Sequence, residues 1–218
     1  AKRVRHMSRY WQATAEIPAT LFPYWQRTAR FEFKGIPQDA FFFARATEGL
    51  LTFFDCVRVS GTRCALPSAA ADSVWHAWAR MAPASLDAFC IRHFGRTIAH
   101  VEEAQMGPDI EAALATCIAT ARQLHGGDPS APTVPRLFAL DGSLRMPGGY
   151  GYRVVQGQVG CQRLDRHGLP EGVVFYPVGM TETVDAARRG GSSCGAVAGC
   201  GGDGCDGGGG CGSGCGGD

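Results

Sequence analysis

A helical pattern of apolar residues marks the segment PQDAFFFARATEGLLTFFDCVRV. Its large apolar side chains follow one another at intervals of seven, four and three residues, at Phe43, Leu50, Phe54 and Val57. These intervals place the side chains on one face of a helix. We therefore predict a long, deeply packed helix over residues 38–59.

Three further helices are predicted from the same periodicity. The first follows LPS, where Ser68 is the expected N-cap, and it ends at Pro83. The second is ASLDAFCIRHF, and Gly95 provides its C-terminal stop. The third spans residues 108–126 and has a clear amphipathic pattern. Together with the first segment, these helices predict a mainly α body.

The two flanks of this body have a different pattern. WQATAEIPATLFPYWQRTARFEFKG is aromatic but interrupted by Pro18 and Pro23, so we expect a short helix, then a strand-like RFEF, covering the core. Near the other end, YRVVQGQVGCQRL and GVVFYPV predict two or three short strands joined by glycine turns. PGGYGY is expected to form a turn, because it lacks the spacing of a phosphate-binding loop.

The predicted fold class is mainly α: a single helical domain with a small C-terminal β element and a disordered Gly/Cys tail. Because the chain starts without Met and Met7 opens MSRYWQAT, we expect residues 1–6 to be read-through or a fragmentation product. We expect four segments: an N-terminal covering segment (residues 1–36), the helical domain (37–127), a loop and short-strand extension (128–189) and the low-complexity tail (190–218).

Composition and charge limit the classes of partner that this protein is expected to bind. The formal net charge is only +1, which argues against nucleic acid, since a phosphate-binding face clusters lysine and arginine. Trp75 and Trp78 have helical spacing and are expected in the core rather than on a base-stacking surface. No apolar run reaches the length of a membrane span, and no h-region follows the basic N-terminus. We expect a cytoplasmic protein without membrane or nucleic-acid partners.

A polar cluster on the middle helices is the first candidate site. Asp72 and His76 are four residues apart and share a helix face, and Cys90 and His93 share a face of the next helix. If these helices pair, His76, His100 and either Cys90 or His93 can gather as metal ligands, with Asp72 as a fourth ligand or an outer partner. Two alternatives stay open: Cys90 as a hydrolase nucleophile, and a packed core cysteine beside a hydrogen-bonded histidine.

The run ADSVWHAW…LDAFCIRHFGRTIAH resembles the glycine-rich domain-containing protein family of plants and bacteria. The resemblance covers residues 38–102, and PRLFALDGSLRMPGGYGY looks like a second family segment. The matching positions are Asp72, Trp75, His76, Cys90, Phe94, Gly95, Arg96 and His100. Where the family commonly has a second histidine, this chain has Trp78. The resemblance implies a helical domain with a shared polar cluster and brings no established activity.

The tail GGSSCGAVAGCGGDGCDGGGGCGSGCGGD is the second candidate site. Its five thiols stand on flexible glycine, at Cys194, Cys200, Cys205, Cys211 and Cys215. They can wrap a soft ion such as Cu(I) or Zn, or crosslink to a thiol-linked protein partner, since their number is odd. Cysteine cyclisation in a peptide precursor and a functionless low-complexity extension are the alternatives.

From the sequence we favour a non-enzymatic protein whose thiol tail binds a metal such as zinc or forms redox crosslinks. The leading alternative is a metal-site protein or enzyme centred on the cluster of Asp72, His76, Cys90 and His100. The cofactor prediction is zinc or another thiophilic metal in either case.

Overall fold

The computed structural model describes residues 10–100 and 109–180. Over these ranges the protein is mainly helical, with one small antiparallel sheet near the C-terminal end. The helices are α2 (Trp11–Ala15), α3 (Leu21–Glu32), α4 (Ala40–Ser60), α5 (Ala69–Met81), α6 (Pro83–Phe94), α8 (Ile110–Leu124) and α9 (Leu140–Leu144). The strands are β1 (Tyr150–Val155), β2 (Gln158–Leu164) and β3 (Pro170–Phe175). This arrangement confirms the predicted fold class for the described part of the chain; the tail from residue 190 onwards lies outside it.

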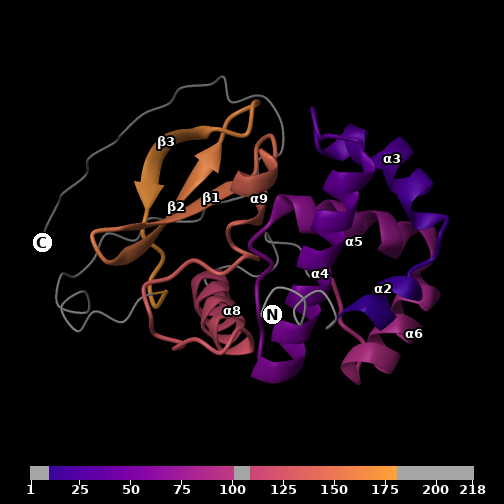
Figure 1. Ribbon diagram of the computed structural model, residues 1–218, viewed down its shortest axis with the longest axis horizontal. Helices are drawn as coiled ribbons and strands as arrows, with labels where there is room; N and C mark the ends of the chain where they lie inside the picture. Colours follow the sequence, from indigo (N-terminus) through magenta and orange to yellow (C-terminus); the bar gives the residue numbers. More distant parts are fainter. Residues whose placement is uncertain (1–9, 101–108, 181–218) are drawn as a thin grey trace, which may run out of the picture.

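Helix α4 is the central element of the core. Asp39 caps its first turn by accepting a hydrogen bond from the Phe42 amide at 2.9 Å, and Gly61 ends it in the left-handed conformation, with φ of 65°. Leu50, Leu51 and most of their neighbours on α4 are buried. Figure 1 shows why: α5 and α8 lie beside α4, with the sheet at one end of the molecule and α2, α3 and α6 at the other.

The predicted strand RFEF is wrong, because α3 continues through Glu32. Its buried residues Leu21, Trp25 and Ala29 are spaced four apart, which is a helical stripe that packs onto α5. Pro23 does not interrupt this helix because it lies in the first turn, where backbone N–H groups have no intrahelical partner. Glu32 is thereby placed on the last turn of α3.

The middle helices follow the prediction closely. Ser68 caps α5 by accepting a hydrogen bond from the Ala71 amide at 3.1 Å. Pro83 both follows α5 and opens α6, because proline is well tolerated at the first position of a helix. Gly95 ends α6 with φ of 77°, as expected. Trp75 and Trp78 are buried, whereas Trp11 lies on the surface.

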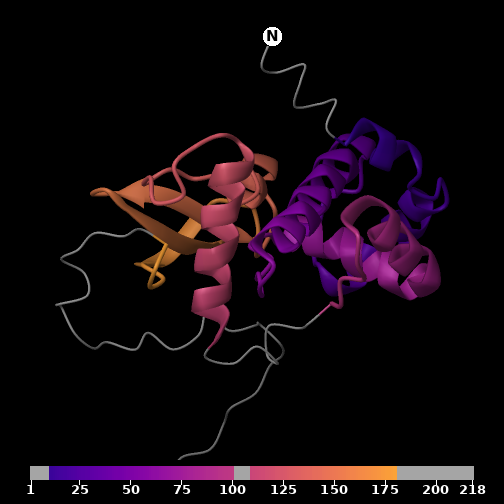
Figure 2. The same ribbon diagram turned by 90° about the horizontal axis from the view of Figure 1, so that it is seen from below.

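The sheet is a three-stranded meander in the order β1-β2-β3. Strands β1 and β2 pair with Tyr152 opposite Cys161, and a bulge lies where β2 meets β3. The turn before β3 packs against the end of α9, where a Cβ on Gly168 would lie 2.2 Å from the backbone carbonyl carbon of Arg145. Gly168 also has φ of 71°, so glycine is required there on both counts. Figure 2 shows α8 lying between the sheet and α4.

A buried aspartate joins the sheet region to the helices. Both oxygens of Asp141 accept two hydrogen bonds each: from the Ser68 hydroxyl (2.6 Å) and the Ala70 amide (3.0 Å), and from the Ala69 (2.9 Å) and Tyr150 amides (3.0 Å). Burial raises the pKa of Asp141, against the effect of these four donors. The four hydrogen bonds of Asp141 thus fix the start of α5 to α9 and β1.

Within the described ranges, every helix is too short or too polar to cross a bilayer.

Candidate metal centre

A row of charged and imidazole side chains runs along one face of α5. Asp72, His76 and Arg80 are spaced four apart on this helix, so their side chains lie one above another. His100, from the segment that follows α6, and Glu32, from the end of α3, complete the row. The row is therefore assembled from three separate parts of the chain.

Asp72 lies between the two histidines. Its Oδ1 is 2.8 Å from Nε2 of His100, and its Oδ2 is 3.4 Å from Nε2 of His76. The two imidazole rings meet edge to face, with centroids 4.6 Å apart. One potential ligand atom from each of these three residues lies within 4.8 Å of the others, which is compact enough to hold a metal ion.

Glu32 orients His76 from the opposite side. Its Oε2 is 2.7 Å from Nδ1 of His76, and its Oε1 forms an ion pair with Arg80. A carboxylate on the far nitrogen of a histidine is the usual outer partner of a metal-binding imidazole, because it fixes the tautomer and the ring orientation. The geometry therefore leaves Nε2 of His76 facing Asp72 as the nitrogen available for a ligand.

His76 has more hydrogen-bond acceptors facing its ring nitrogens than a neutral imidazole has N–H groups. A neutral imidazole has one N–H, yet both of its ring nitrogens here face a carboxylate oxygen. A neutral His76 that donates from Nδ1 to Glu32 leaves an unprotonated Nε2 at 3.4 Å from Oδ2 of Asp72, where a bound cation would be stabilised by both groups. With neutral imidazoles the row is net negative, because it contains two carboxylates, Asp72 and Glu32, and one guanidinium, that of Arg80. Such a row favours a bound cation.

Aromatic rings surround the cluster on its buried side. The rings of Trp75 and His100 meet edge to face, with centroids 4.5 Å apart. The rings of Phe33 and His76 meet in the same way, with centroids 5.9 Å apart. The side chains of His76 and His100 are only 21% and 20% exposed, and Asp72 is 30% exposed. The indole N–H of Trp75 is buried and has no hydrogen-bond partner among the described residues. The side chains of the site are thus partly buried and partly in contact with solvent.

The structure brings Asp72, His76 and His100 together, as the sequence suggested, but Cys90 is not part of this group. Cys90 is fully buried on the core face of α6, and this burial, followed by the charge of Asp87, raises the pKa of its thiol to about 12. A backbone hydrogen bond links its sulfur to Ile98, two residues before His100. Cys90 therefore supports the segment that carries His100, and its high pKa disfavours a nucleophilic role.

The remaining candidates lie elsewhere. His93, on α6, has Nε2 3.2 Å from Glu16 and is not part of the Asp72, His76 and His100 group. The tail thiols Cys194, Cys200, Cys205, Cys211 and Cys215 lie outside the described residues, so their metal binding stays a prediction.

The pattern of RFEF predicts a strand, so Glu32 is absent from the candidate site that the sequence defines. The available signal was the charge pattern of α5: Asp72, His76 and Arg80 at four-residue intervals form a polar stripe that requires a partner on a neighbouring helix. The helical stripe of α3 places Glu32 in that position.

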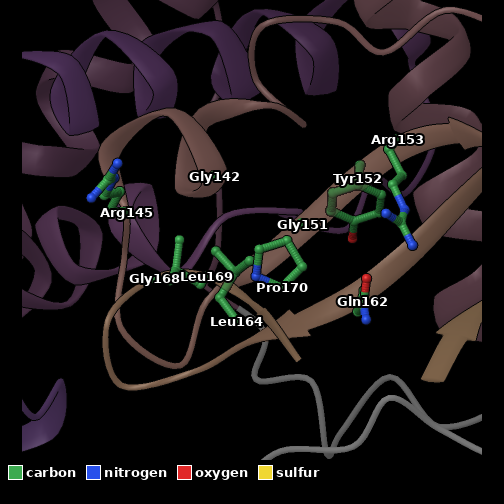
Figure 3. A pocket seen from close by; sticks show the side chains of 10 residues that line it. All are labelled: Gly142, Arg145, Gly151, Tyr152, Arg153, Gln162, Leu164, Gly168, Leu169 and Pro170. Atoms are coloured by element: carbon green, nitrogen blue, oxygen red, sulfur yellow. The ribbon is translucent and has the colours of Figure 1, made fainter. Parts of the chain in front are cut away.

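A hollow of about 210 Å³ lies at the sheet end of the molecule (Figure 3). Arg145 and Arg153 lie on opposite sides of it, with Gln162 on the Arg153 side. The buried Oε1 of Gln162 has no partner among the described residues, while its Nε2 donates to the Gly172 carbonyl at 2.6 Å. The residues lining this hollow include no histidine, cysteine or carboxylate, so it lacks an acid–base pair or a metal-ligand set. The row on α5 is the better candidate for chemistry.

Fold and site together define a mainly helical protein with a half-buried histidine–aspartate–histidine cluster. Residues 40–171 match the model of the UCP032817-like family, and since this match covers more than half of the chain, the chain belongs to that family. No curated protein and no solved structure matches the chain significantly. The matched region contains Asp72, His76 and His100, whereas Glu32 precedes it.

Proposed function

We propose that this protein binds one divalent transition-metal ion of the zinc class, held by Asp72, His76 and His100. The ligand atoms are Nε2 of each histidine and a carboxylate oxygen of Asp72, with Glu32 as the outer partner of His76. The contact that carries the proposal is that of His76, whose two nitrogens both face carboxylates. A cation beside Nε2 removes the need for a second proton on this ring.

The chemistry of the ligand atoms limits which metal ions the site can bind. Two imidazole nitrogens and one carboxylate oxygen suit zinc and neighbouring first-row ions, whereas Cu(I) prefers sulfur. Three protein ligands leave coordination positions for water or a substrate group, which is the pattern of reactive rather than purely structural zinc sites. The resemblance to the glycine-rich domain-containing family supports the same residues, since it falls on Asp72, His76 and His100.

The thiol tail is a separate candidate for the same function. Five cysteines on a glycine-rich chain offer soft ligands, and this hypothesis predicts thiophilic ions bound through residues 194–215. Because the two sites share no residue, variants distinguish them directly.

The test is a titration of the full-length protein with Zn(II), followed by Co(II) absorption spectra to identify the ligands. We expect one equivalent to bind the α5 site in the wild type and in a variant with all five tail cysteines changed to serine. His76→Ala or His100→Ala should weaken this binding by more than about 100-fold. His93→Ala is the matched control, since His93 pairs with Glu16 outside the cluster, and it should bind normally.

Two results would contradict the proposal. Binding that disappears only in the tail variant would assign the metal to the tail. Absence of binding to the α5 site, together with nitrogen NMR shifts of an imidazolium at His76, would show that the row is a hydrogen-bond network with a protonated histidine.

Metal affinity should also fall towards acidic pH, because protons compete for the imidazole nitrogens.

A further inference from the structure

Three free thiols of the body meet between α4 and α8. Cys56 lies near the end of α4, Cys64 follows that helix, and Cys117 is in the middle of α8. The Cys117 thiol lies within interaction distance of the thiols of both Cys56 and Cys64. Cys56 and Cys117 are fully buried, whereas Cys64 is only partly buried and is the member of the cluster that solvent can reach.

Backbone contacts hold Cys64 against α8. The amide of Ala65 donates a hydrogen bond to the Ala113 carbonyl at 3.2 Å. Cys117 is one helical turn beyond Ala113 and therefore lies on the same face of α8. The hydroxyl of Ser60 lies 3.3 Å from the Cys64 sulfur on its other side. The approach of the two thiols is thus fixed by the fold.

The two thiols of this pair differ in character. Hydrogen bonding from Cys117 lowers the pKa of Cys64, and Ser60 adds to this effect, while burial opposes it. Burial raises the pKa of Cys117, so that it stays protonated and serves as the donor. Cys64 is therefore the more easily ionised and the more accessible sulfur, which are the two properties of a reactive cysteine.

We propose that Cys64 and Cys117 form a reversible disulfide when the protein meets a hydroperoxide such as hydrogen peroxide. In the first step the Cys64 thiolate attacks one peroxide oxygen, the O–O bond breaks, and the leaving hydroxide takes up the proton that Cys64 released, giving Cys64 sulfenic acid and water. In the second step the Cys117 sulfur attacks Cys64, the S–O bond breaks, and the hydroxide leaves as water with the Cys117 proton. Two thiols and one peroxide thus give one disulfide and two waters.

The position of this bond gives it a structural effect. It would tie the connection between α4 and α5 to α8, and Ser68, the cap of α5, lies only four residues after Cys64. The disulfide would close the loop between Cys64 and Cys117, which restricts the unfolded chain. The crosslink should therefore raise the thermal midpoint of unfolding by about 5 °C or more. This effect is independent of metal binding and of the tail.

Trypsin separates the three thiols, which makes the test direct. Cleavage after arginine gives peptides 46–58, 64–80 and 97–122, which contain Cys56, Cys64 and Cys117 respectively and no other cysteine. The full-length tail variant with five serines is treated with equimolar hydrogen peroxide, free thiols are blocked, and the protein is digested without reduction. We expect a crosslinked species of 64–80 and 97–122 that dithiothreitol releases, with the higher thermal midpoint.

Two variants and one internal control complete the experiment. Cys64→Ser should lose the crosslink, and Cys117→Ala should accumulate sulfenic acid on Cys64, detected with dimedone. Cys161 is buried on β2 with its pKa raised to about 11, and it should stay unmodified. A bridge between Cys56 and Cys117 instead, or reaction of Cys64 no faster than Cys161, would overturn the proposal. Oxidation of Cys64 without any bridge, in the tail variant that retains Cys117, would also overturn the proposal.

Discussion

The first turn of α5 has a different aspartate on each of its two sides. On the side of α9 and β1, Asp141 is fully buried and accepts four hydrogen bonds, so every donor that faces it is used. On the side of α3, Asp72 is partly exposed and faces two imidazoles, one of which is also claimed by Glu32. Donors and acceptors balance around Asp141 and do not balance around His76.

This difference separates a structural carboxylate from a candidate ligand. A buried carboxylate with a full set of donors is a rigid connection, because removing any partner leaves a buried polar group unsatisfied. A surplus of acceptors around a half-buried imidazole instead favours a proton or a metal ion that the chain does not supply. The same residue type therefore has two different surroundings on the two sides of the first turn of α5.

The largest expected effect tests the structural side. Asp141→Asn replaces one oxygen, which accepts two hydrogen bonds, by an amide that faces two donors, so the free energy of unfolding should fall by about 3 kcal/mol. Asp72→Asn is the matched control, and it should cost about 0.5 kcal/mol of stability, from the lost charge near the helix N-terminus. Urea unfolding measures both. Equal losses would show that the two carboxylates do not differ in role.

The second effect concerns the outer partner on the α3 side. Glu32→Gln keeps the shape of the side chain but removes the charge that orients His76, so Zn(II) affinity should fall by about 10-fold to 100-fold. Competition with a chromophoric chelator measures this change. Glu16→Gln, which alters the carboxylate beside His93, is the control and should leave the affinity unchanged. An unchanged affinity in Glu32→Gln would remove Glu32 from the site.

The third effect tests the serine at the start of α5. Ser68→Ala removes both the N-cap bond to the Ala71 amide and one donor to Asp141, and it should lower the free energy of unfolding by about 1–2 kcal/mol. Ser143→Ala, at an exposed position on α9, should change it by less than about 0.5 kcal/mol. Thermal and urea unfolding give the comparison. A loss as small as that of the control would mean that Ser68 does not hold the two sides together.

The smallest effect is expected at Arg80. The side chain of Arg80 is more than half exposed where it pairs with Glu32, so Arg80→Gln should lower metal affinity by only about twofold to threefold. The same chelator competition detects it, and added salt should narrow the gap between variant and wild type. A loss larger than that of Glu32→Gln would mean that Arg80 acts on the site by another route than through Glu32.

The sequence was a good guide where a local signal decided the structure. The caps Ser68 and Gly95, and the spacing of Asp72 and His76, depend on residues close together in the chain, and the structure has them as predicted. The contact of His100 with Asp72 also agrees with the predicted cluster. The predicted gathering of Cys90 with these residues failed because helix rotation, which core packing decides, turns its thiol inwards.

The chain by itself determined helices α4, α5, α6 and α8, the small sheet and the polar stripe on α5, because periodicity, caps and glycine turns act over a few residues. The tertiary structure alone decided which distant side chains complete that stripe. Glu32 reaches His76 only because α3 packs on α5, and Asp141 reaches Ser68 only because α9 packs behind it. The meeting of Cys64 with Cys117 likewise depends on the packing of α4 and α8. Contacts of this kind join residues tens of positions apart, and the packing of whole helices determines them.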